Sequence, residues 1–373
     1  MRVKGMKSVI RLISYTSAAA LAWMTAGAQA ATVDLATIQK YAPTIYLNAY
    51  ENNRPTDVLS FLAQSKLLDA NGNVLANPAT PAALAVNTSA SNYMVPANGV
   101  YPSASNDFES GVAATASGSS GVGQVNAPVY VKVLDFGTYV DIKYFFFYTW
   151  NGFQAFRVGI LQGLTTNPYN FDWSQFALHY GDWEHVTVRL SEDLSTVKGV
   201  FFSEHHDSAW VTNPSFSGTH PLVYAGWNSH ANYPTSGIQV NDTILNSPGV
   251  IPVSWLKVVD VTTNSGSFAA YHVPSNFYAN GLVWTPWSNT SNLVLLDSDP
   301  VAAQWLAFNG QWGPSVTEKI EEPPSSLPSA GRSELYVLAN GASVLNLLSS
   351  YTSESGPNGP MAVDWDISKE PAE

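Results

Sequence analysis

The sequence predicts a mainly β protein, built as a β-sandwich-like domain with peripheral short helices. Short runs of β-branched and aromatic residues, separated by turn residues, carry this prediction. The composition agrees with it, because 45% of the residues are hydrophobic, 12% are aromatic and only 12% are charged. Removing the first 30 of the 373 residues leaves 343, ample for a large core. We expect one β-rich domain over residues 31–373, with two closely packed domains as the alternative.

Two short helices are expected near the start of the chain, over residues 36–50 and 56–68. Both stretches have mixed helical patterning, and Pro43 and Pro55 act as breaks. Residues 71–126 are rich in Ala, Ser, Asn, Gly and Pro. A linker is one interpretation, but a long irregular segment inside a compact domain more often covers a site or packs over the surface.

The predicted strands begin after Ala127, where the composition changes. Each run is rich in valine or aromatic residues and ends at turn residues. Residues 250–296 continue in the same style, residues 323–328 form a proline-rich irregular run, and a last helix is expected near 334–348. The predicted strands are Val129–Leu134, Tyr139–Tyr148, Glu184–Leu190, Val197–Ser203 and Leu222–Gly226.

The segment before Ala31 has the pattern of a secretory signal peptide. Four bases lie between Arg2 and Arg11, an apolar run extends from Leu12 to Met24, and Ala28-Gln-Ala30 supplies small residues for cleavage. A membrane anchor is the alternative, but the run is shorter than the roughly 20 residues that a span requires. We therefore expect a secreted or periplasmic protein with no transmembrane segment in the mature chain.

Charge and cysteine content limit the partners and the chemistry. The whole chain carries a net charge of −12, and the segment before Ala31 holds four bases and no acids, so −12 − 4 gives −16 for the mature chain. Such an acidic protein is a poor partner for nucleic acid and for anionic membrane surfaces. The chain has no cysteine, which excludes disulfides and thiolate metal sites.

The most informative segment is Phe176–Leu190, which places acids and histidines in a predicted strand. Alternation puts Asp182 and Glu184 on one face, with Trp183 and His185 on the other. Buried carboxylates need compensation, and a hard cation with an imidazole nearby is the simplest candidate. The two acids could instead cap turns, or pair with arginines at positions 157 and 189.

Two further histidines are candidates for proton transfer. His205 lies in Ser203-Glu-His-His-Asp207, where a polar hairpin end is the alternative interpretation. His230, in Asn228-Ser-His-Ala231, can be a general base, a ligand or a buried histidine that orients a loop. The sequence has no Gly-x-Ser-x-Gly elbow, zinc helix or phosphate loop, although a Ser–His pair remains open.

The chain has twelve tryptophans, and aromatic side chains can stack on sugars or fill a core. The tryptophans of interest are Trp183, Trp210, Trp227, Trp284 and Trp287.

Several blocks between residues 41 and 360 resemble the vacuolar protein sorting-associated protein 62 family. This resemblance covers nearly the whole mature chain, but it implies no defined chemistry. The blocks are Tyr41-Ala-Pro43, Glu51, Arg54-Pro55, the aromatic strand Tyr139 to Gly152, Gly181-Asp-Trp-Glu-His-Val186, Asn228-Ser-His-Ala-Asn-Tyr-Pro234, Gly310-Gln-Trp-Gly313 and Gly356-Pro-Asn-Gly-Pro360.

A second resemblance is to the necrosis- and ethylene-inducing secreted toxins, which carry Gly-His-Arg-His-Asp-Trp-Glu. Here His179-Tyr-Gly-Asp-Trp-Glu184 has the same interval. The resemblance implies a β-sandwich that binds a divalent metal, with His179, Asp182 and Glu184 as ligands. We expect calcium or magnesium, because carboxylate oxygens prefer hard cations. Asn151 is nearest to the position of a further family ligand, an Asp, and its neutral amide is a weaker ligand. Gly181 replaces the second histidine of the toxin motif, which puts toxin activity in doubt more than metal binding.

These observations predict an exported, divalent-metal-binding protein that acts at a cell surface or on extracellular glycan or lipid. One alternative is a metal-assisted hydrolase, in which His205 or His230 moves the proton. A structural envelope protein is the other alternative.

The signal-peptide interpretation predicts the N-terminus of the exported protein. Cleavage after Ala30 leaves a chain that begins near Ala31. N-terminal sequencing or intact mass of the mature protein checks this, and an intact Met1 would contradict it.

Overall fold

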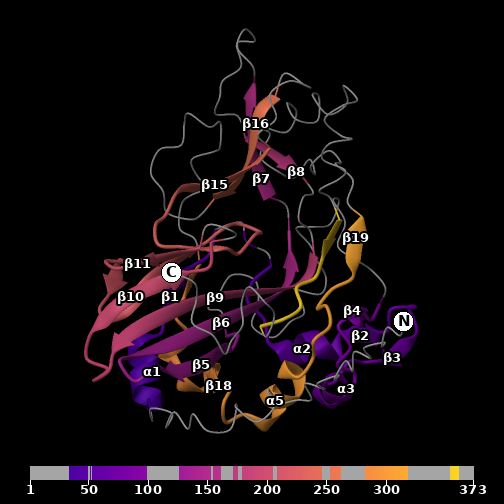
Figure 1. The fold of residues 1–373 in the computed structure, drawn as a ribbon, viewed down its shortest axis with the longest axis horizontal. Helices are drawn as coiled ribbons and strands as arrows, with labels where there is room; N and C mark the ends of the chain where they lie inside the picture. Colours follow the sequence, from indigo (N-terminus) through magenta and orange to yellow (C-terminus); the bar gives the residue numbers. More distant parts are fainter. Residues whose placement is uncertain are drawn as a thin grey trace, which may run out of the picture.

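The computed structural model describes residues 33–48, 51, 53–98, 126–152, 154–160, 171–174, 179–204, 208–245, 253–261, 282–317 and 353–360. The structure is mainly β, as predicted, and its centre is a six-stranded sheet in the order β11-β10-β9-β6-β5-β18 (Figure 1). The longest strands, β6 and β9, are antiparallel neighbours at the middle of this sheet. Its strands are β5 (Val129–Asp135), β6 (Tyr139–Asn151), β9 (His179–Ser191), β10 (Val197–Phe202), β11 (Ala209–Val211) and β18 (Leu293–Leu295).

A second sheet packs on one face of the central sheet. Its order is β12-β13-β1-β17, and β14 pairs with β13. Strand β1 lies parallel to β13, with Thr44 opposite Leu222, so the sheet joins the start of the described chain to its middle. The strands are β1 (Thr44–Tyr46), β12 (Phe216–Ser217), β13 (His220–Ala225), β14 (Asn232–Tyr233) and β17 (Val283–Trp284).

Short helices and a small sheet cover the opposite face of the central sheet. The sheet has the order β3-β2-β4. Aspartate side chains begin three of the helices: Asp34, Asp57 and Asp299 each accept backbone N–H groups of the first turn. The elements are α1 (Leu35–Tyr41), which packs with the second sheet, and α2 (Val58–Ala63), α3 (Pro81–Val86), α5 (Pro300–Leu306), β2 (Ser65–Leu68), β3 (Val74–Ala76) and β4 (Tyr93–Pro96).

The remaining strands form two smaller sheets. A four-stranded sheet has the order β15-β16-β7-β8, and β19 pairs with β20. Two short 3-10 helices, η5 (Pro286–Ser288) and η6 (Thr290–Asn292), precede β18. The strands are β7 (Gln154–Ile160), β8 (Phe171–Ser174), β15 (Ile238–Leu245), β16 (Val253–Val261), β19 (Ser315–Thr317) and β20 (Ser353–Ser355).

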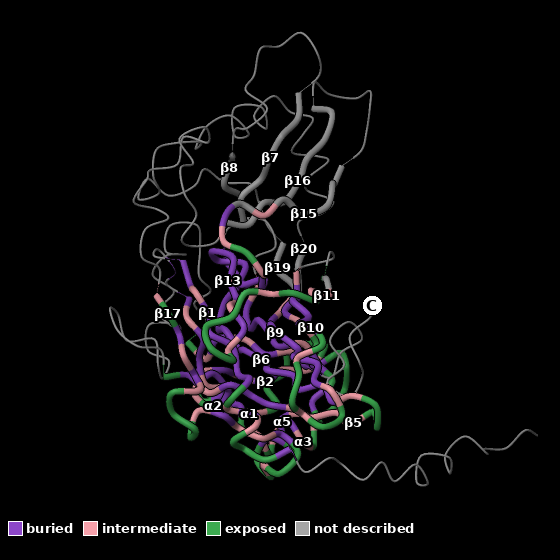
Figure 2. The backbone as a smooth tube through the Cα atoms, turned by 90° about the vertical axis from the view of Figure 1, so that its left-hand side faces the viewer, coloured by how far each residue is buried: buried purple, intermediate pink, exposed green. Residues whose placement is uncertain are grey.

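The central sheet separates two hydrophobic cores. One lies against the second sheet and contains Tyr144, Phe146, Val186 and Val188 together with residues of α1, β1 and β13. The other lies against the helices and contains Phe145, Phe147 and Trp183 with residues of α2, α3 and α5. Figure 2 shows the buried residues concentrated along β6 and β9. The alternation of the two strands therefore supplies both cores at once.

The predicted strands are confirmed, whereas both predicted helices are too long. Helix α1 ends at Tyr41 because Pro43 follows it, and the chain then enters β1. Helix α2 ends at Ala63, and Ser65–Leu68 is a strand because it pairs with β3 and β4. The segment predicted to be irregular, residues 71–126, is described up to residue 98, and that part contains β3, α3 and β4, whereas residues 99–125 lie outside the described residues.

Several predictions lie outside the described residues: the signal peptide at 1–30, the irregular run at 323–328 and the helix at 334–348. Within the described ranges, no helix is long and apolar enough to span a membrane.

Candidate functional site

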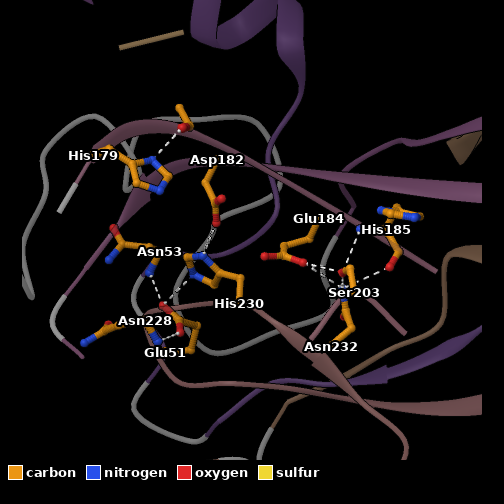
Figure 3. A network of polar contacts seen from close by, with 11 residues as sticks. Glu51, Asn53, His179, Asp182, Glu184, His185, Ser203, Asn228, His230 and Asn232 are labelled. Atoms are coloured by element: carbon orange, nitrogen blue, oxygen red, sulfur yellow. Dashed lines mark hydrogen bonds and ion pairs between the residues drawn. The ribbon is translucent and has the colours of Figure 1, made fainter. Parts of the chain in front are cut away.

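A network of buried polar residues lies between the two main sheets, at the end where β9 begins (Figure 3). Strand β9 contributes Asp182 and Glu184, the turn between β13 and β14 contributes His230, and the segment after β1 contributes Glu51. All four side chains are nearly buried. Because a buried charge is costly unless it is compensated, their contacts define what the site can do.

Asp182 and Glu184 share one face of β9, as predicted, but His179 reaches that face only because the alternation reverses. Tyr180 and Trp183 are three residues apart and would lie on opposite faces of a regular strand, yet both pack in the core beneath the helices. The reversal occurs at Gly181, whose φ of 72° is left-handed. His179, the residue before Tyr180, therefore returns to the face of Asp182.

In strand β6 the alternation of side chains between the two faces also reverses, at the position opposite this part of β9. Tyr148, opposite Asp182, packs in the core beside the second sheet, whereas Trp150, two residues later, packs in the core beneath the helices. Asn151, the cross-strand partner of His179, therefore lies on the same side as Tyr148. The structure thus brings all four predicted metal ligands, Asn151, His179, Asp182 and Glu184, to one face of the β6–β9 pair.

His230 is held between two carboxylates and is fully buried. Its Nδ1 lies 2.8 Å from Oδ2 of Asp182, and its Nε2 forms an ion pair with Oε1 of Glu51 at 3.5 Å. The ring stacks on Tyr148, with centroids 3.8 Å apart and planes within 7°. Both ring nitrogens therefore face an acid, and one ring face is covered by an aromatic ring.

The turn that carries His230 is held in a conformation uncommon for its residues. His230 and Asn228 have φ values of 57° and 64°, and non-glycine residues rarely adopt this region. Glu51 holds the turn by accepting the backbone N–H of Asn228 at 2.8 Å, while its other oxygen accepts that of Asn53 at 2.7 Å. Strained backbone of this kind is found mainly at functional sites.

The carboxylates determine the charge of His230. Burial lowers the pKa of His230, but the negative charge of Glu51 and the hydrogen bond with Asp182 raise it to about 9. His230 is therefore an imidazolium at neutral pH. Arg54 is a second cation nearby: burial lowers its pKa, and the charge of Glu51 opposes that effect.

Glu184 is fixed by a separate set of hydrogen bonds. The Ser203 hydroxyl donates to Oε2 of Glu184 at 2.5 Å, and the Asn232 side-chain amide donates to the same oxygen at 3.3 Å. Ser203 Oγ in turn accepts the backbone N–H of His185 at 3.2 Å and the Asn232 amide at 3.1 Å. Because its proton is committed to Glu184, Ser203 acts here as a support for the carboxylate.

Several polar atoms around this face have no hydrogen-bond partner among the described residues. The Tyr148 hydroxyl and Asn232 Oδ1 are fully buried. Asp182, with a side chain only 8% exposed, uses Oδ2 for His230 and leaves Oδ1 without a donor. His179 donates from Nδ1 to the Gly181 carbonyl at 2.9 Å, which leaves Nε2 without a partner.

The donor chemistry of these atoms fits a hard cation. A carboxylate oxygen and an imidazole nitrogen are suitable ligands, and a metal-binding histidine commonly donates its other ring nitrogen to a carbonyl, as His179 does. The residues fit a cation in their donor chemistry and in the face of the sheet that they share. Within the described residues, however, no three or more His, Asp or Glu side chains are already grouped closely enough to hold an ion.

One of the arginines predicted to pair with the two acids has a different partner. Arg189 forms a buried pair with Asp141, with Nε–Oδ1 and Nη2–Oδ2 distances of 2.9 and 3.0 Å. The Arg157 side chain and His205 lie outside the part of the chain whose side chains are described. The prediction that His205 transfers a proton therefore stays a prediction.

The tryptophans are used mainly for packing. Trp183, Trp227 and Trp284 are at most 3% exposed and cannot stack on a sugar from solvent. Trp287 is partly exposed but stacks on His220, with centroids 3.9 Å apart. Trp210 packs against the guanidinium of Arg189.

Sequence reasoning missed the functional roles of Glu51, Tyr148, Ser203 and Asn232. Glu51 follows β1, far before Asp182 in the chain, so no local spacing links it to the Asp-Trp-Glu motif. Its only signal was membership of the blocks shared with a known family. The aromatic strand that contains Tyr148 has the pattern of a core strand, and Tyr148 does pack in the core.

Comparison with known proteins identifies the family. The sequence profile of vacuolar protein sorting-associated protein 62 matches residues 16–261. The chain belongs to the vacuolar protein sorting-associated protein 62 family. Among relatives of this family, TDA6 of Saccharomyces cerevisiae, which is named for vacuolar protein sorting, is 23% identical over 311 residues. The match covers 73% of this chain and only 59% of TDA6.

Solved structures with some similarity to this vacuolar protein sorting-associated protein 62 family member include a necrosis and ethylene inducing protein. Necrosis and ethylene inducing protein 2, from the causal agent of cocoa's witches' broom disease, has a TM-score of 0.31 and 16% identity, over 75% of this chain and 81% of that chain. The non-toxic HaNLP3 protein has a TM-score of 0.30 and 13% identity, over 74% and 81%. NLPPya in complex with mannosamine has a TM-score of 0.28 and 12% identity, over 74% and 80%.

The raised pKa of His230 predicts a loss of stability at alkaline pH. The pKa is about 9 in the folded protein and about 6.5 in the unfolded chain, so the stabilisation is complete below 6.5 and is lost as pH rises through 9. Between these values the free energy of unfolding should fall by up to about 1.4 kcal/mol per pH unit. Glu51→Gln should flatten this slope.

Urea unfolding between pH 6 and 9.5 measures the effect, with Glu192→Gln, at an exposed glutamate after β9, as the matched control. Equal slopes for the wild-type protein and Glu51→Gln would mean that Glu51 does not set the charge of His230.

Proposed function

We propose that this chain is an exported binding protein that holds a divalent cation, calcium or magnesium, on the Asp182–Glu184 face. In this proposal it acts at a cell surface or on extracellular glycan or lipid. Oδ1 of Asp182 and Nε2 of His179 are the atoms available to coordinate the ion. Glu184 would add a second carboxylate, and Asn151 would add a neutral oxygen. The ion would supply positive charge to a buried acidic cluster and coordination positions for a ligand oxygen.

One observation carries the proposal. The Asp182 side chain is 8% exposed, yet Oδ1 accepts no hydrogen bond from any described residue. A carboxylate on a nearly buried side chain is costly unless its charge is compensated, and a bound cation would supply that compensation. Because His179 Nε2 on the same face is also unused, a cation satisfies both atoms better than a water molecule or a neutral donor does.

Binding is preferred to hydrolysis because of His230. A general acid or base needs a ring nitrogen that can reach the substrate, and both nitrogens of His230 face carboxylates inside the protein. Its pKa of about 9 also keeps it protonated, so it is a poor base near neutral pH. Its role in the proposal is to hold Asp182 with Oδ2 engaged and Oδ1 available.

A cell-surface or extracellular ligand suits the charge of the protein. The acidic mature chain repels anionic surfaces, so direct electrostatic attraction cannot attach it to them. A protein-bound cation makes the local charge positive, and calcium accepts oxygen ligands from sugars, phosphates and carboxylates alike. Glycan or lipid headgroup binding should therefore require the cation.

The proposed cation predicts a metal-dependent thermal shift. A ligand that binds only the folded state stabilises it by RT ln(1 + [L]/Kd), about 2.7 kcal/mol at 100 times Kd. Calcium or magnesium should therefore raise the melting temperature of the chelator-treated protein. Asp182→Asn and His179→Gln should each reduce that rise, and His179→Gln does so without removing the partner of His230. Asp193→Asn, at an exposed carboxylate, is the matched control.

Calorimetric titration with calcium, magnesium and zinc gives the affinities, and binding to glycans and to phosphatidylserine vesicles is then compared with and without the preferred ion. An unchanged melting temperature with all three metals would contradict the proposal. Metal binding that Asp193→Asn weakens as much as Asp182→Asn would place the ion elsewhere.

A further inference from the structure

Two sequence blocks, Gly310–Gly313 and Gly356–Pro360, take no part in the polar network but lie against the start of β9. The backbone N–H of Trp312 donates to the Pro357 carbonyl at 2.8 Å, which joins the two blocks. The Trp312 ring packs against Trp183, with centroids 5.2 Å apart. The strands beside these blocks, β19 and β20, pair with each other (Figure 1).

The backbones of these blocks contact β9 directly. A Cβ atom added to Gly313 would lie 2.1 Å from the carbonyl oxygen of Tyr180. One added to Gly356 would lie 2.1 Å from the Gly313 nitrogen and 2.5 Å from the same Tyr180 oxygen. Real Cβ atoms do not approach other atoms so closely. We use "glycine crossing" for the close approach of Trp312, Gly313 and Gly356 to Tyr180 and Gly181.

Gly181 completes the glycine crossing. A Cβ atom added there would lie 2.8 Å from both Cβ and the carbonyl oxygen of Trp312. Gly181 also has the left-handed φ at which β9 reverses its faces. The crossing therefore contacts the chain at the one position that decides on which face His179 lies.

We infer that the glycine crossing holds His179 on the same face of β9 as Asp182. Trp312, Gly313 and Gly356 are therefore positioning residues of the site. The close approach of the two blocks confines the backbone at Tyr180 and Gly181. This confinement keeps the Gly181 carbonyl where it accepts the His179 Nδ1 proton, and it thereby fixes the tautomer that leaves Nε2 unprotonated. The consequence for cation affinity rests on the proposed function, whereas the position of His179 does not.

Gly356→Ala tests the inference, because Gly356 is remote from His179 in the sequence and contacts the start of β9 at the crossing. Its φ is not left-handed, so the substitution adds a steric clash without backbone strain. Gly199→Ala is the matched control, since a Cβ atom there would meet its nearest atom at an ordinary 3.4 Å. The full chain is used throughout.

Two readouts separate positioning from general packing. Imidazole ¹H–¹⁵N correlation spectra, assigned with His179→Gln, report the tautomer of His179, and calorimetry reports calcium affinity. In Gly356→Ala the Nδ1-protonated signal of His179 should be lost or averaged, and calcium affinity should fall by about 10–100-fold, the usual effect of losing a partner that orients a ligand. Gly199→Ala should change neither.

A folded Gly356→Ala variant with unchanged His179 signals would overturn the inference. If the wild-type protein binds no metal while Gly356→Ala still alters His179, the proposed function fails and the positioning role stands. If Gly356→Ala does not fold, Gly181→Ala poses the same question through a milder 2.8 Å clash, with Gly137→Ala as control for its left-handed φ in open space. Unaltered His179 signals in Gly181→Ala would then contradict the inference.

Discussion

The buried imidazolium of His230, between Asp182 and Glu51, is the interaction on which the site depends. It joins strand β9, the turn before β14 and the segment after β1, which are far apart in the sequence. Two buried acids without this cation would repel each other, and breaking a buried ion pair by removing one partner typically costs about 3–5 kcal/mol. Stacking on Tyr148 and the backbone bonds to Glu51 then hold the turn in its left-handed conformation.

The three acids of the cluster have different partners. Glu51 is fully occupied by His230 and two backbone N–H groups, and Glu184 is held by Ser203 and Asn232. Asp182 is bound through one oxygen only, which leaves the other oxygen on the face shared with His179. This arrangement suits the proposed cation, because Oδ1 of Asp182 and Nε2 of His179 have no partner among the described residues. In the proposed function, the contacts that stabilise the fold also orient Asp182 for binding.

Period-two alternation was enough to predict the long strands and the common face of Asp182 and Glu184, because β6 and β9 lie at the centre of the sheet and bury both faces. Alternation alone would have placed His179 on the opposite face. The reversal at Gly181 depends on contacts with residues near 312 and 356, and such tertiary contacts leave no local pattern. The helix over residues 56–68 was predicted too long for a similar reason, since pairing with β4 makes Ser65–Leu68 a strand.

Anomalous diffraction from crystals grown with calcium, or with manganese as a stronger scatterer, tests the central claim most directly. The account predicts a peak about 2.3–2.6 Å from Oδ1 of Asp182 for calcium, or slightly closer for manganese, with His230 still bound to Oδ2. It also predicts that His179 or Glu184 contributes to the same ion. A metal peak remote from Asp182, or a crystal in which a protein donor occupies Oδ1 and no ion binds, would contradict it.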